Sequence, residues 1–394
     1  MENPYKELKP STRILMGPGP SNVDPRVLKA MATPLVGHLD PDFLEIMNET
    51  MDMLKLLFQT RNLLTIPISG TGSSGMEAAF CNVVEKGDRV LICVNGLFGQ
   101  RMCDVAERCG AEVITANANW GYIITPEKVK EAIREKPKIV AIVHAETSTG
   151  ILQPLEEIKQ IAKENGALFL VDTVTSLAGA PVKVDDWDID ICYSGTQKCL
   201  SCPPGLAPIT FNDIAMNVIR NRKSKVQSWY LDMTMIERYW GSERFYHHTA
   251  PVSMIYAFHE ALRIIHEEGL ENRFRRHKMN GLALKSGLES MGLRLIAQDD
   301  YRAPMLTTVG IPEGIDDVKV RKRLLNNYYI ELGGSLGEFK GKSWRVGLMG
   351  HSSTKQNVLF LLSALDNILA EEGYKFERGA GVDAASCFYE SFEK

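Results

Sequence analysis

The sequence has no long hydrophobic run, no strong excess of charge and no regular cysteine framework. Its longest apolar stretches have the length of strands, so nothing in it predicts a helix that spans a membrane. The first residues lack the apolar core of a secretory signal, and the last residues carry no lipidation or peroxisomal motif. A net charge of −4 on 394 residues does not indicate nucleic acid or an anionic membrane as a partner. We therefore expect a cytoplasmic protein with neither partner.

The 8 cysteines show no spacing typical of a disulfide framework or a zinc site. Cys199 and Cys202 form a C-x-x-C pair, but no second pair stands at the distance that zinc ligation requires. His247 and His248 are adjacent, so in a strand they would point to opposite faces and would not bind one metal together. We expect no metal site.

Between about residues 62 and 211, short apolar runs alternate with helix-like stretches. Strands that are apolar on both faces and are joined by helices predict a parallel sheet that helices cover on both sides. The runs lie at residues 63–69, 89–94, 111–116, 138–144, 167–172, 190–195 and 206–211. The pattern therefore predicts an α/β fold.

The pattern changes after about residue 250. One long helix is expected over residues 252–277, where the charged second half indicates a connection to another unit, and a separate helix is expected over 280–291. The alternation that follows predicts a smaller α+β domain of about 110 residues. We expect an N-terminal arm, a large domain, a small domain and a tail, with the bounds 1–20, 21–265, 266–375 and 376–394. The sequence does not decide whether the tail docks on the protein.

A glycine-rich segment, residues 70–75, matches G-x-G-x-x-G between a predicted strand and a predicted helix. Backbone N–H groups in such a turn and at the start of the helix form an anion site. A dinucleotide site would also need an acidic residue at the end of the next strand, which here ends in Asn95 and Gly96. The plain alternative is a turn without a ligand. We predict a phosphate site and not a dinucleotide site.

Two other predicted strands lead into reactive side chains. Asp172 ends the run at 167–172, and Lys198 follows the run at 190–195. In an open parallel sheet these strand ends and the glycine loop lie along one edge. A desolvated lysine can form a Schiff base with a carbonyl group. Either residue alone could be an ordinary loop residue. Together with the loop they fit pyridoxal phosphate, whose phosphate, ring nitrogen and aldehyde need an anion site, an acid and an amine.

The chain resembles the class V aminotransferases of fold type I, in particular the branch of the alanine–glyoxylate and serine–pyruvate aminotransferases. The resemblance runs from about residue 16 to about residue 372, with the motifs MGPGPSN (16–22), SGTGSSGMEAA (69–79), NGLFGQR (95–101), HAETSTG (144–150), LVDTVTSLAG (170–179), YSGTQK (193–198), FYHHTAP (245–251) and WRVGLMG (344–350). It implies a large domain with a mainly parallel seven-stranded sheet, a smaller C-terminal α+β domain, and pyridoxal phosphate as cofactor.

The resemblance also implies a role for individual residues. Lys198 would hold the cofactor and carry the substrate proton, and Asp172 would pair with the ring nitrogen. The other implied cofactor contacts are Thr71, Gly72, Ser73, Phe98, Thr147, Gln197, Tyr246 and Thr249. Phe98 stands where relatives usually have Trp, and Ser73 stands where they have His.

Substrate contacts are implied as well. Arg345 would bind the α-carboxylate as a planar fork. Gly37, His38 and Thr147 would line the substrate side. Tyr246 and Thr249 match positions that reach the cofactor phosphate of a neighbouring subunit, so the implied assembly is a homodimer.

The implied reaction moves an amino group from alanine or serine to glyoxylate or pyruvate, with alanine–glyoxylate transamination first. Serine–pyruvate, serine–glyoxylate and ureidoglycine–glyoxylate transamination are the alternatives. The segment HLDPDF resembles the ureidoglycine enzymes, but Tyr246 stands where an amide residue would be expected. A cysteine desulfurase would need His where Gln197 precedes the lysine. A binding protein without catalysis is the alternative from another class.

Overall fold

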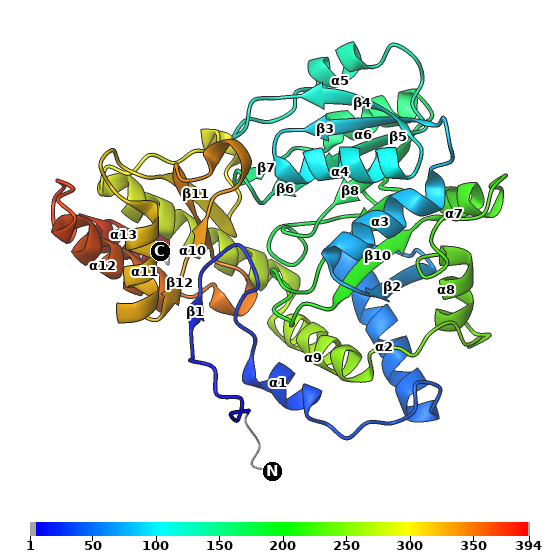
Figure 1. Cartoon of the computed structure of the whole chain (residues 1–394), viewed down its shortest axis with the longest axis horizontal. Coiled ribbons are helices and arrows are strands. Elements are labelled where there is room, and N and C mark those ends of the chain that lie inside the picture. Colours follow the sequence, from blue (N-terminus) through cyan, green and yellow to red (C-terminus); the bar gives the residue numbers. More distant parts are fainter. Residues whose placement is uncertain (1–4, 393–394) are drawn as a thin grey trace.

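The computed structural model describes residues 5–392. A large sheet with helices on both faces lies beside a smaller unit (Figure 1). The large sheet has seven strands in the order β2-β10-β9-β8-β5-β3-β4, and β10 runs antiparallel to both of its neighbours. The strands are β2 Leu64–Ser69, β3 Arg89–Val94, β4 Glu112–Asn117, β5 Ile139–Val143, β8 Leu168–Asp172, β9 Ile191–Tyr193 and β10 Leu206–Phe211. Each coincides with a predicted run, so the prediction of a mainly parallel seven-stranded sheet is confirmed.

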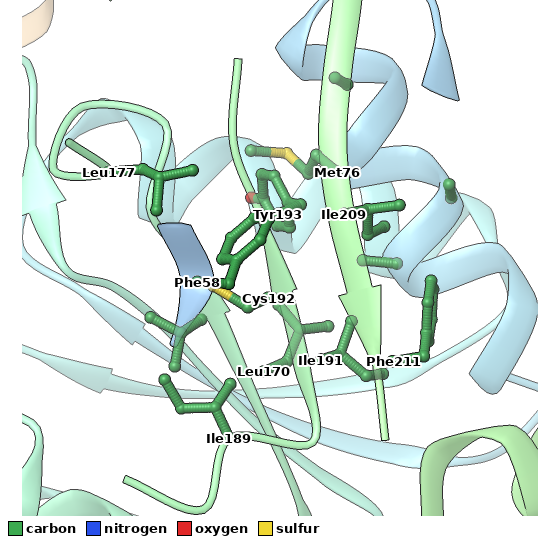
Figure 2. Packing of buried hydrophobic residues seen from close by; sticks show 14 of the residues in the cluster. Phe58, Met76, Leu170, Leu177, Ile189, Ile191, Cys192, Tyr193, Ile209 and Phe211 are labelled. Atoms are coloured by element: carbon green, nitrogen blue, oxygen red, sulfur yellow. The ribbon is translucent and has the colours of Figure 1, made fainter. Parts of the chain in front are cut away.

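The central strands are buried on both faces because helices cover each side, as in other parallel sheets. The helices of this unit are α1 Pro25–Met31, α2 Pro41–Phe58, α3 Gly72–Val83, α4 Leu97–Arg108, α5 Pro126–Ala132, α6 Glu156–Glu164, α7 Asp213–Arg220, α8 Met233–Trp240 and α9 Val252–Glu268. Two short strands, β6 Ala145–Glu146 and β7 Ile151–Leu152, form a hairpin after β5. Figure 2 shows side chains of β9 and β10 packed with Met76 of α3 and Phe58 of α2. This packing fixes the strand ends that carry the polar residues.

The smaller unit is built on a three-stranded sheet in the order β11-β14-β13. Its strands are β11 Leu306–Gly310, β12 Ile330–Glu331, β13 Gly333–Gly334 and β14 Ser343–Gly347, and its helices are α10 Leu270–Ser290, α11 Asp317–Asn327, α12 Lys355–Glu371 and α13 Ala380–Phe392. Their buried side chains form a second hydrophobic cluster, separate from the one around the large sheet. No helix within residues 5–392 is long and apolar enough to cross a bilayer.

The N-terminal segment belongs to both units. Its strand β1, Ile14–Leu15, pairs in parallel with β12 of the smaller unit, and Met16 is part of the second cluster. The chain then turns back to the large sheet, where the backbone N–H of Ser21 donates to the Gln197 carbonyl (3.0 Å). In Figure 1 the blue segment with β1 therefore runs between the two units.

The expected single helix over residues 252–277 is wrong. Helix α9 ends at Glu268, Gly269 adopts φ +78°, and α10 then runs without a break past residue 280. A positive φ favours glycine, and this glycine turns the chain between the two helices. Glu268 stabilises the bend because it accepts hydrogen bonds from Arg273 and Arg276 of α10, both at 2.6 Å.

The C-terminal tail docks on the smaller unit. It forms α13, which packs against α10 and α12. Tyr389 is fully buried, and its hydroxyl donates to Asn280 of α10 (2.8 Å). Gly287 lets the two helices approach closely, because a Cβ atom there would lie 2.7 Å from the Gly381 carbonyl oxygen.

Candidate active site

Four segments from different parts of the chain meet at the carboxyl edge of the large sheet. They are the glycine loop after β2, Asp172 at the end of β8, the loop after β9 that carries Lys198, and the hairpin after β5 that carries Thr147. Ligands bind at this edge in open α/β sheets. The parallel topology therefore brings together residues that lie far apart in the sequence.

The glycine loop leads directly into α3, which begins at Gly72. Thr71 stands at the N-cap, but its side chain does not cap the helix, so the first turn of α3 faces outward for an anion. Gly72 lies beside Gly195, since a Cβ atom at Gly72 would be in ordinary van der Waals contact, 3.5 Å from the Gly195 Cα atom. Thr71 and Ser73 are exposed beside this turn. The geometry suits a phosphate group.

Asp172 is only 3% exposed and is held from two sides. Its Oδ1 accepts from the Val174 backbone N–H (2.8 Å), and its Oδ2 accepts from the Tyr193 hydroxyl (2.7 Å). Tyr193 is its direct partner in the parallel register of β8 and β9, which the sequence analysis missed. Burial raises the pKa of Asp172 to about 6, while the two hydrogen bonds and the charge of Lys198 oppose that rise.

Lys198 is 8% exposed, and its Nζ donates to the Pro18 carbonyl of the N-terminal segment. Gly19 lies against the same amine, at φ +115°, and a Cβ atom there would lie 2.8 Å from Nζ. Burial, with a smaller effect from the positive charge of Arg345, lowers the pKa of Lys198 to about 8. A large fraction of this amine can therefore be neutral near pH 8, as attack on a carbonyl requires.

Arg345 reaches the site from β14 of the smaller unit. Its Nε and Nη2 donate to the Gly334 carbonyl (3.0 and 2.9 Å), and its Nη1 donates to the Thr147 carbonyl (3.3 Å). A guanidinium has five N–H donors, so donors remain for a carboxylate. Burial lowers the pKa of Arg345 to about 10, and the charge of Glu146 opposes this.

Phe98 and Gln197 are two further residues that were predicted to contact the cofactor. The guanidinium of Arg101 lies over the Phe98 ring, with its Cζ atom 4.8 Å from the ring centroid. The Oε1 atom of Gln197 is buried without a hydrogen-bond partner. The hydroxyl of Thr147 bonds to that of Thr175. Arg101 was not predicted to belong to the site.

A second group of predicted residues lies apart from Lys198. Tyr246 is 54% exposed, Thr249 and Gly37 are exposed, and the rings of His38 and Tyr246 lie 5.3 Å apart. Within residues 5–392 no hydrogen bond, ion pair or ring contact joins any of these four to Lys198, Asp172 or Arg345 of the same chain. The neighbouring His248 does bond to Ser69 at the end of β2 (2.8 Å), so the group borders the phosphate loop.

A cavity of about 1030 Å³ lies between α10, α13 and the loop at residues 179–181. Neither Lys198 nor any other predicted site residue lines it. Its wall carries acidic and basic side chains in equal number, four of each. We therefore do not place the chemistry there.

The residues present fit pyridoxal phosphate. The open first turn of α3 and the unpartnered Gln197 side chain suit its phosphate, and the buried carboxylate of Asp172 suits its ring nitrogen. The buried amine of Lys198 suits its aldehyde. A seven-stranded α/β sheet with this set of groups at its carboxyl edge defines a pyridoxal-phosphate enzyme of fold type I.

The chain belongs to the class-V aminotransferases, whose family model matches residues 14–336. It is 44% identical to the (S)-ureidoglycine–glyoxylate transaminase of Bacillus subtilis, over 98% of this chain and 97% of that protein. It is 42% identical to the alanine–glyoxylate aminotransferase of Callithrix jacchus, over 92% of this chain and 89% of the relative. The predicted family, the aminotransferase activity and the cofactor, pyridoxal phosphate, are confirmed.

Solved structures agree with this assignment. The ureidoglycine–glyoxylate aminotransferase of Bacillus subtilis superposes with a TM-score of 0.95 at 46% identity, covering 98% of this chain and 100% of that chain. The alanine–glyoxylate aminotransferase of Nostoc sp. superposes with a TM-score of 0.91 at 50% identity, covering 93% of this chain and 97% of that chain. The fold-type I architecture is therefore that of the known aminotransferases.

Proposed function

We propose that the protein transfers an amino group from a small amino acid to glyoxylate. The observation that carries this proposal is the buried guanidinium of Arg345, which keeps free N–H donors and whose charge acts on Lys198. One guanidinium fork binds one α-carboxylate, which both an amino acid and glyoxylate possess. The relatives described above are all named for glyoxylate as a substrate.

Each residue then has a defined task. Bound pyridoxal phosphate supplies an electron sink for the bond that breaks at the substrate Cα. Lys198 carries the proton away from Cα as a base, because its lowered pKa of about 8 keeps part of it neutral. Asp172 keeps the ring nitrogen protonated, since an ionised carboxylate beside it favours the charged ring. Arg345 orients the substrate through its carboxylate, and Pro18 with Gly19 covers the lysine from the arm side.

We rank alanine first as the donor, with serine as the alternative of similar size and pyruvate as an alternative acceptor. A second candidate, (S)-ureidoglycine, is favoured by the Bacillus subtilis relative, which matches 98% of this chain. Against it, Tyr246 offers a phenol where an amide would be expected for a ureido group.

We also propose a homodimer with composite sites. Tyr246, Thr249, Gly37 and His38 would serve the site of the neighbouring subunit, which explains why they border the phosphate loop and yet do not contact Lys198 of their own chain. Exposed aromatic side chains surround them, with Trp229 59% and Phe245 49% exposed. Aromatic residues that are exposed in the single chain are typical of an interface. A cytoplasmic location is proposed because all eight cysteines are free thiols.

A substrate panel tests the reaction. Alanine, serine and (S)-ureidoglycine would each be paired with glyoxylate, pyruvate and 2-oxoglutarate, and kcat/KM would be measured. We expect alanine with glyoxylate to be fastest and 2-oxoglutarate to be poor, because its second carboxylate would be desolvated without a partner. If 2-oxoglutarate were the best acceptor, the proposal of a small-substrate site would be wrong.

Borohydride reduction tests the lysine. In the cofactor-loaded enzyme it should fix pyridoxal phosphate to the peptide that contains Lys198, as seen by mass spectrometry. Lys198→Ala should lose this label and at least about 1000-fold in kcat. Lys225→Ala, which changes an exposed lysine, should keep the label on Lys198 and the wild-type kcat. A label on another lysine would refute the assignment.

A further inference from the structure

Glu146 is a buried carboxylate in the site that the proposed reaction does not use. It ends strand β6, is 1% exposed, and lies one residue before Thr147. Its charge acts on Lys198, Asp172 and Arg345, since it raises the pKa of each of them. A buried carboxylate is costly unless its hydrogen bonds are made, so its presence here needs a reason.

Both oxygens of Glu146 are saturated by donors. Oε1 accepts from the backbone N–H and the hydroxyl of Ser148 (3.0 and 2.6 Å). Oε2 accepts from the backbone N–H groups of Phe98 and Gly99 (3.1 and 3.4 Å). Burial raises the pKa of Glu146, and these donors oppose the rise. A proton on either oxygen would face a donor instead of an acceptor, so the arrangement favours the ionised form.

The same contacts fix the first turn of α4. Phe98 and Gly99 are its second and third residues, and the backbone N–H of Leu97, the first, donates to the Ser148 hydroxyl (3.0 Å). Gly96 precedes the helix and presses on Glu146, because a Cβ atom at Gly96 would collide with the Cγ of Glu146. The direction of the Phe98 ring therefore depends on the carboxylate of Glu146.

The titratable and charged groups that share this buried region are Asp172, Tyr193, Lys198, Cys199 and Arg345, and the exposed Arg101 of α4 acts on Tyr193. Lys198 and Arg345 are cations, and burial drives both toward the neutral form. A fixed negative charge beside them counteracts that effect. Asp172 supplies one such charge, but it is also to be paired with the ring nitrogen.

We propose that Glu146 is a positioning residue of the transamination site, which holds the first turn of α4 and the Phe98 ring in place and supplies a fixed negative charge that partly offsets the effect of burial on the Lys198 nitrogen and on Arg345. This inference rests on the role proposed for Lys198. It adds a second buried carboxylate, with a different task, to the one that pairs with the cofactor.

The test compares two buried carboxylates. Glu146→Gln removes the charge in the site. Asp190→Asn removes a charge just before β9, at the opposite edge of the large sheet, where Asp190 accepts from the Phe169 backbone N–H and from Asn212 (both 2.7 Å). The visible absorbance of the pyridoxal-phosphate-loaded enzymes would be titrated with pH. We expect the midpoint to fall by about one pH unit in Glu146→Gln, because a buried negative charge that acts on the Lys198 nitrogen is lost, and to stay unchanged in Asp190→Asn.

Thermal unfolding of both variants without cofactor measures their structural cost. If Glu146→Gln lost stability as Asp190→Asn does but kept the wild-type midpoint, Glu146 would be structural only and the proposal would fail. Borohydride labelling of the same samples separates this from failure of the proposed function. A label that moves away from Lys198 refutes the function, whereas a label on Lys198 with an unshifted midpoint refutes only the inference.

Ser148→Ala is the second variant. It tests the positioning role of Glu146 even when Glu146→Gln does not fold. It keeps the charge but removes the hydroxyl that bonds to both Glu146 and Leu97. We expect the dissociation constant of pyridoxal phosphate to rise about tenfold while the midpoint stays near the wild-type value. The control is Ser343→Ala, a buried serine of the smaller unit that bonds to Ser335. Equal affinities in Ser148→Ala and the control would overturn the positioning role.

Discussion

At the scale of residues, the site is a set of buried charges whose protonation states depend on one another. Lys198 and Arg345 are cations that burial shifts toward neutrality, and Asp172 and Glu146 are carboxylates that burial shifts toward protonation. Neither pair would be stable alone in an apolar interior. Together they form a site in which one amine is ready to lose its proton near neutral pH.

The buried amine of Lys198 should make the cofactor-free protein more stable at high pH. The pKa of Lys198 is about 8 in the folded protein and 10.5 as a model value. Between these values the unfolded chain binds a proton that the folded chain does not, so stability rises with pH through this window. Lys198→Met should raise the free energy of unfolding at pH 7 by up to about 3 kcal/mol and lose this advantage between pH 8 and 10.5. Chemical denaturation of the cofactor-free proteins measures this.

Lys225→Met is the control for that prediction, because the side chain of Lys225 is exposed. It should leave stability within about 0.5 kcal/mol of wild type at both pH values. A gain from Lys198→Met that did not change with pH would mean that charge burial is not its cause.

Arg345 should contribute equally to the rates of the half-reactions with the amino donor and with the oxo-acid acceptor. Arg345→Lys keeps a positive charge but loses the planar fork, so we expect about 100-fold lower rates with alanine and with glyoxylate. Stopped-flow absorbance of each half-reaction measures both rates. Arg321→Lys is the matched control, since Arg321 forms a similar fork with Asp317 in the smaller unit. A loss confined to one half-reaction would contradict a shared carboxylate site.

At the scale of elements, α13 illustrates a segment whose structure depends on its partners. Its buried residues contact α10 and α12, and Tyr389 bonds to Asn280 (2.8 Å). A helix of this length is marginal alone in water, so packing stabilises it.

Tyr389 should therefore contribute strongly to stability. Tyr389→Ala should destabilise the protein by about 3–5 kcal/mol because it empties a large buried volume. Tyr389→Phe should cost only about 1 kcal/mol, the contribution of the hydrogen bond. Urea denaturation followed by fluorescence measures both. Glu390→Ala, at the neighbouring exposed position, should have almost no effect. If Tyr389→Ala changed the free energy of unfolding as little as Glu390→Ala, α13 would not pack against α10 as it does in the structure.

At the scale of the molecule, the active site needs both units of the chain and, as we propose, a second copy. The division of the chain into a large domain at residues 21–265 and a small domain at residues 266–375 is likewise a proposal. The arm and α13 pack into the smaller unit's cluster from outside the range 266–375. The site between the units is thus completed by Arg345 from one side and Pro18 from the other.

Mixing inactive variants tests the composite dimer. Lys198→Ala and the double variant Tyr246→Ala, Thr249→Ala damage the same site from different subunits. Their hybrid should contain one intact site, so random reassociation should restore about a quarter of wild-type activity. Mixing Lys198→Ala with Asp172→Asn should restore nothing, because both residues come from one subunit. A monomer in light scattering, or no recovery in the first mixture, would contradict the shared site.

The sequence by itself determined the large sheet and the chemistry along its edge. The seven apolar runs, the loop at 70–75, Asp172 and Lys198 are local signals, because strand periodicity and turn composition depend on neighbouring residues. Only the tertiary structure decided what surrounds them. Pro18 covers Lys198 across 180 positions, and Arg345 reaches Thr147 across 198, contacts that no local pattern contains.

Long-range contacts also explain the other features of the structure that the sequence did not predict. Gly269 separates α9 from α10, although propensity alone favours one helix there, because Glu268 bonds to two arginines of the next helix. The tail forms α13 because it packs on α10, where Asn280 accepts a hydrogen bond from Tyr389 and Gly287 lets the two helices approach closely. Glu146 looks like any loop carboxylate in sequence, and its charge matters only because folding buries it beside Lys198. Burial and long-range partners are properties of the folded chain, so the protonation of the site could not be predicted from the sequence.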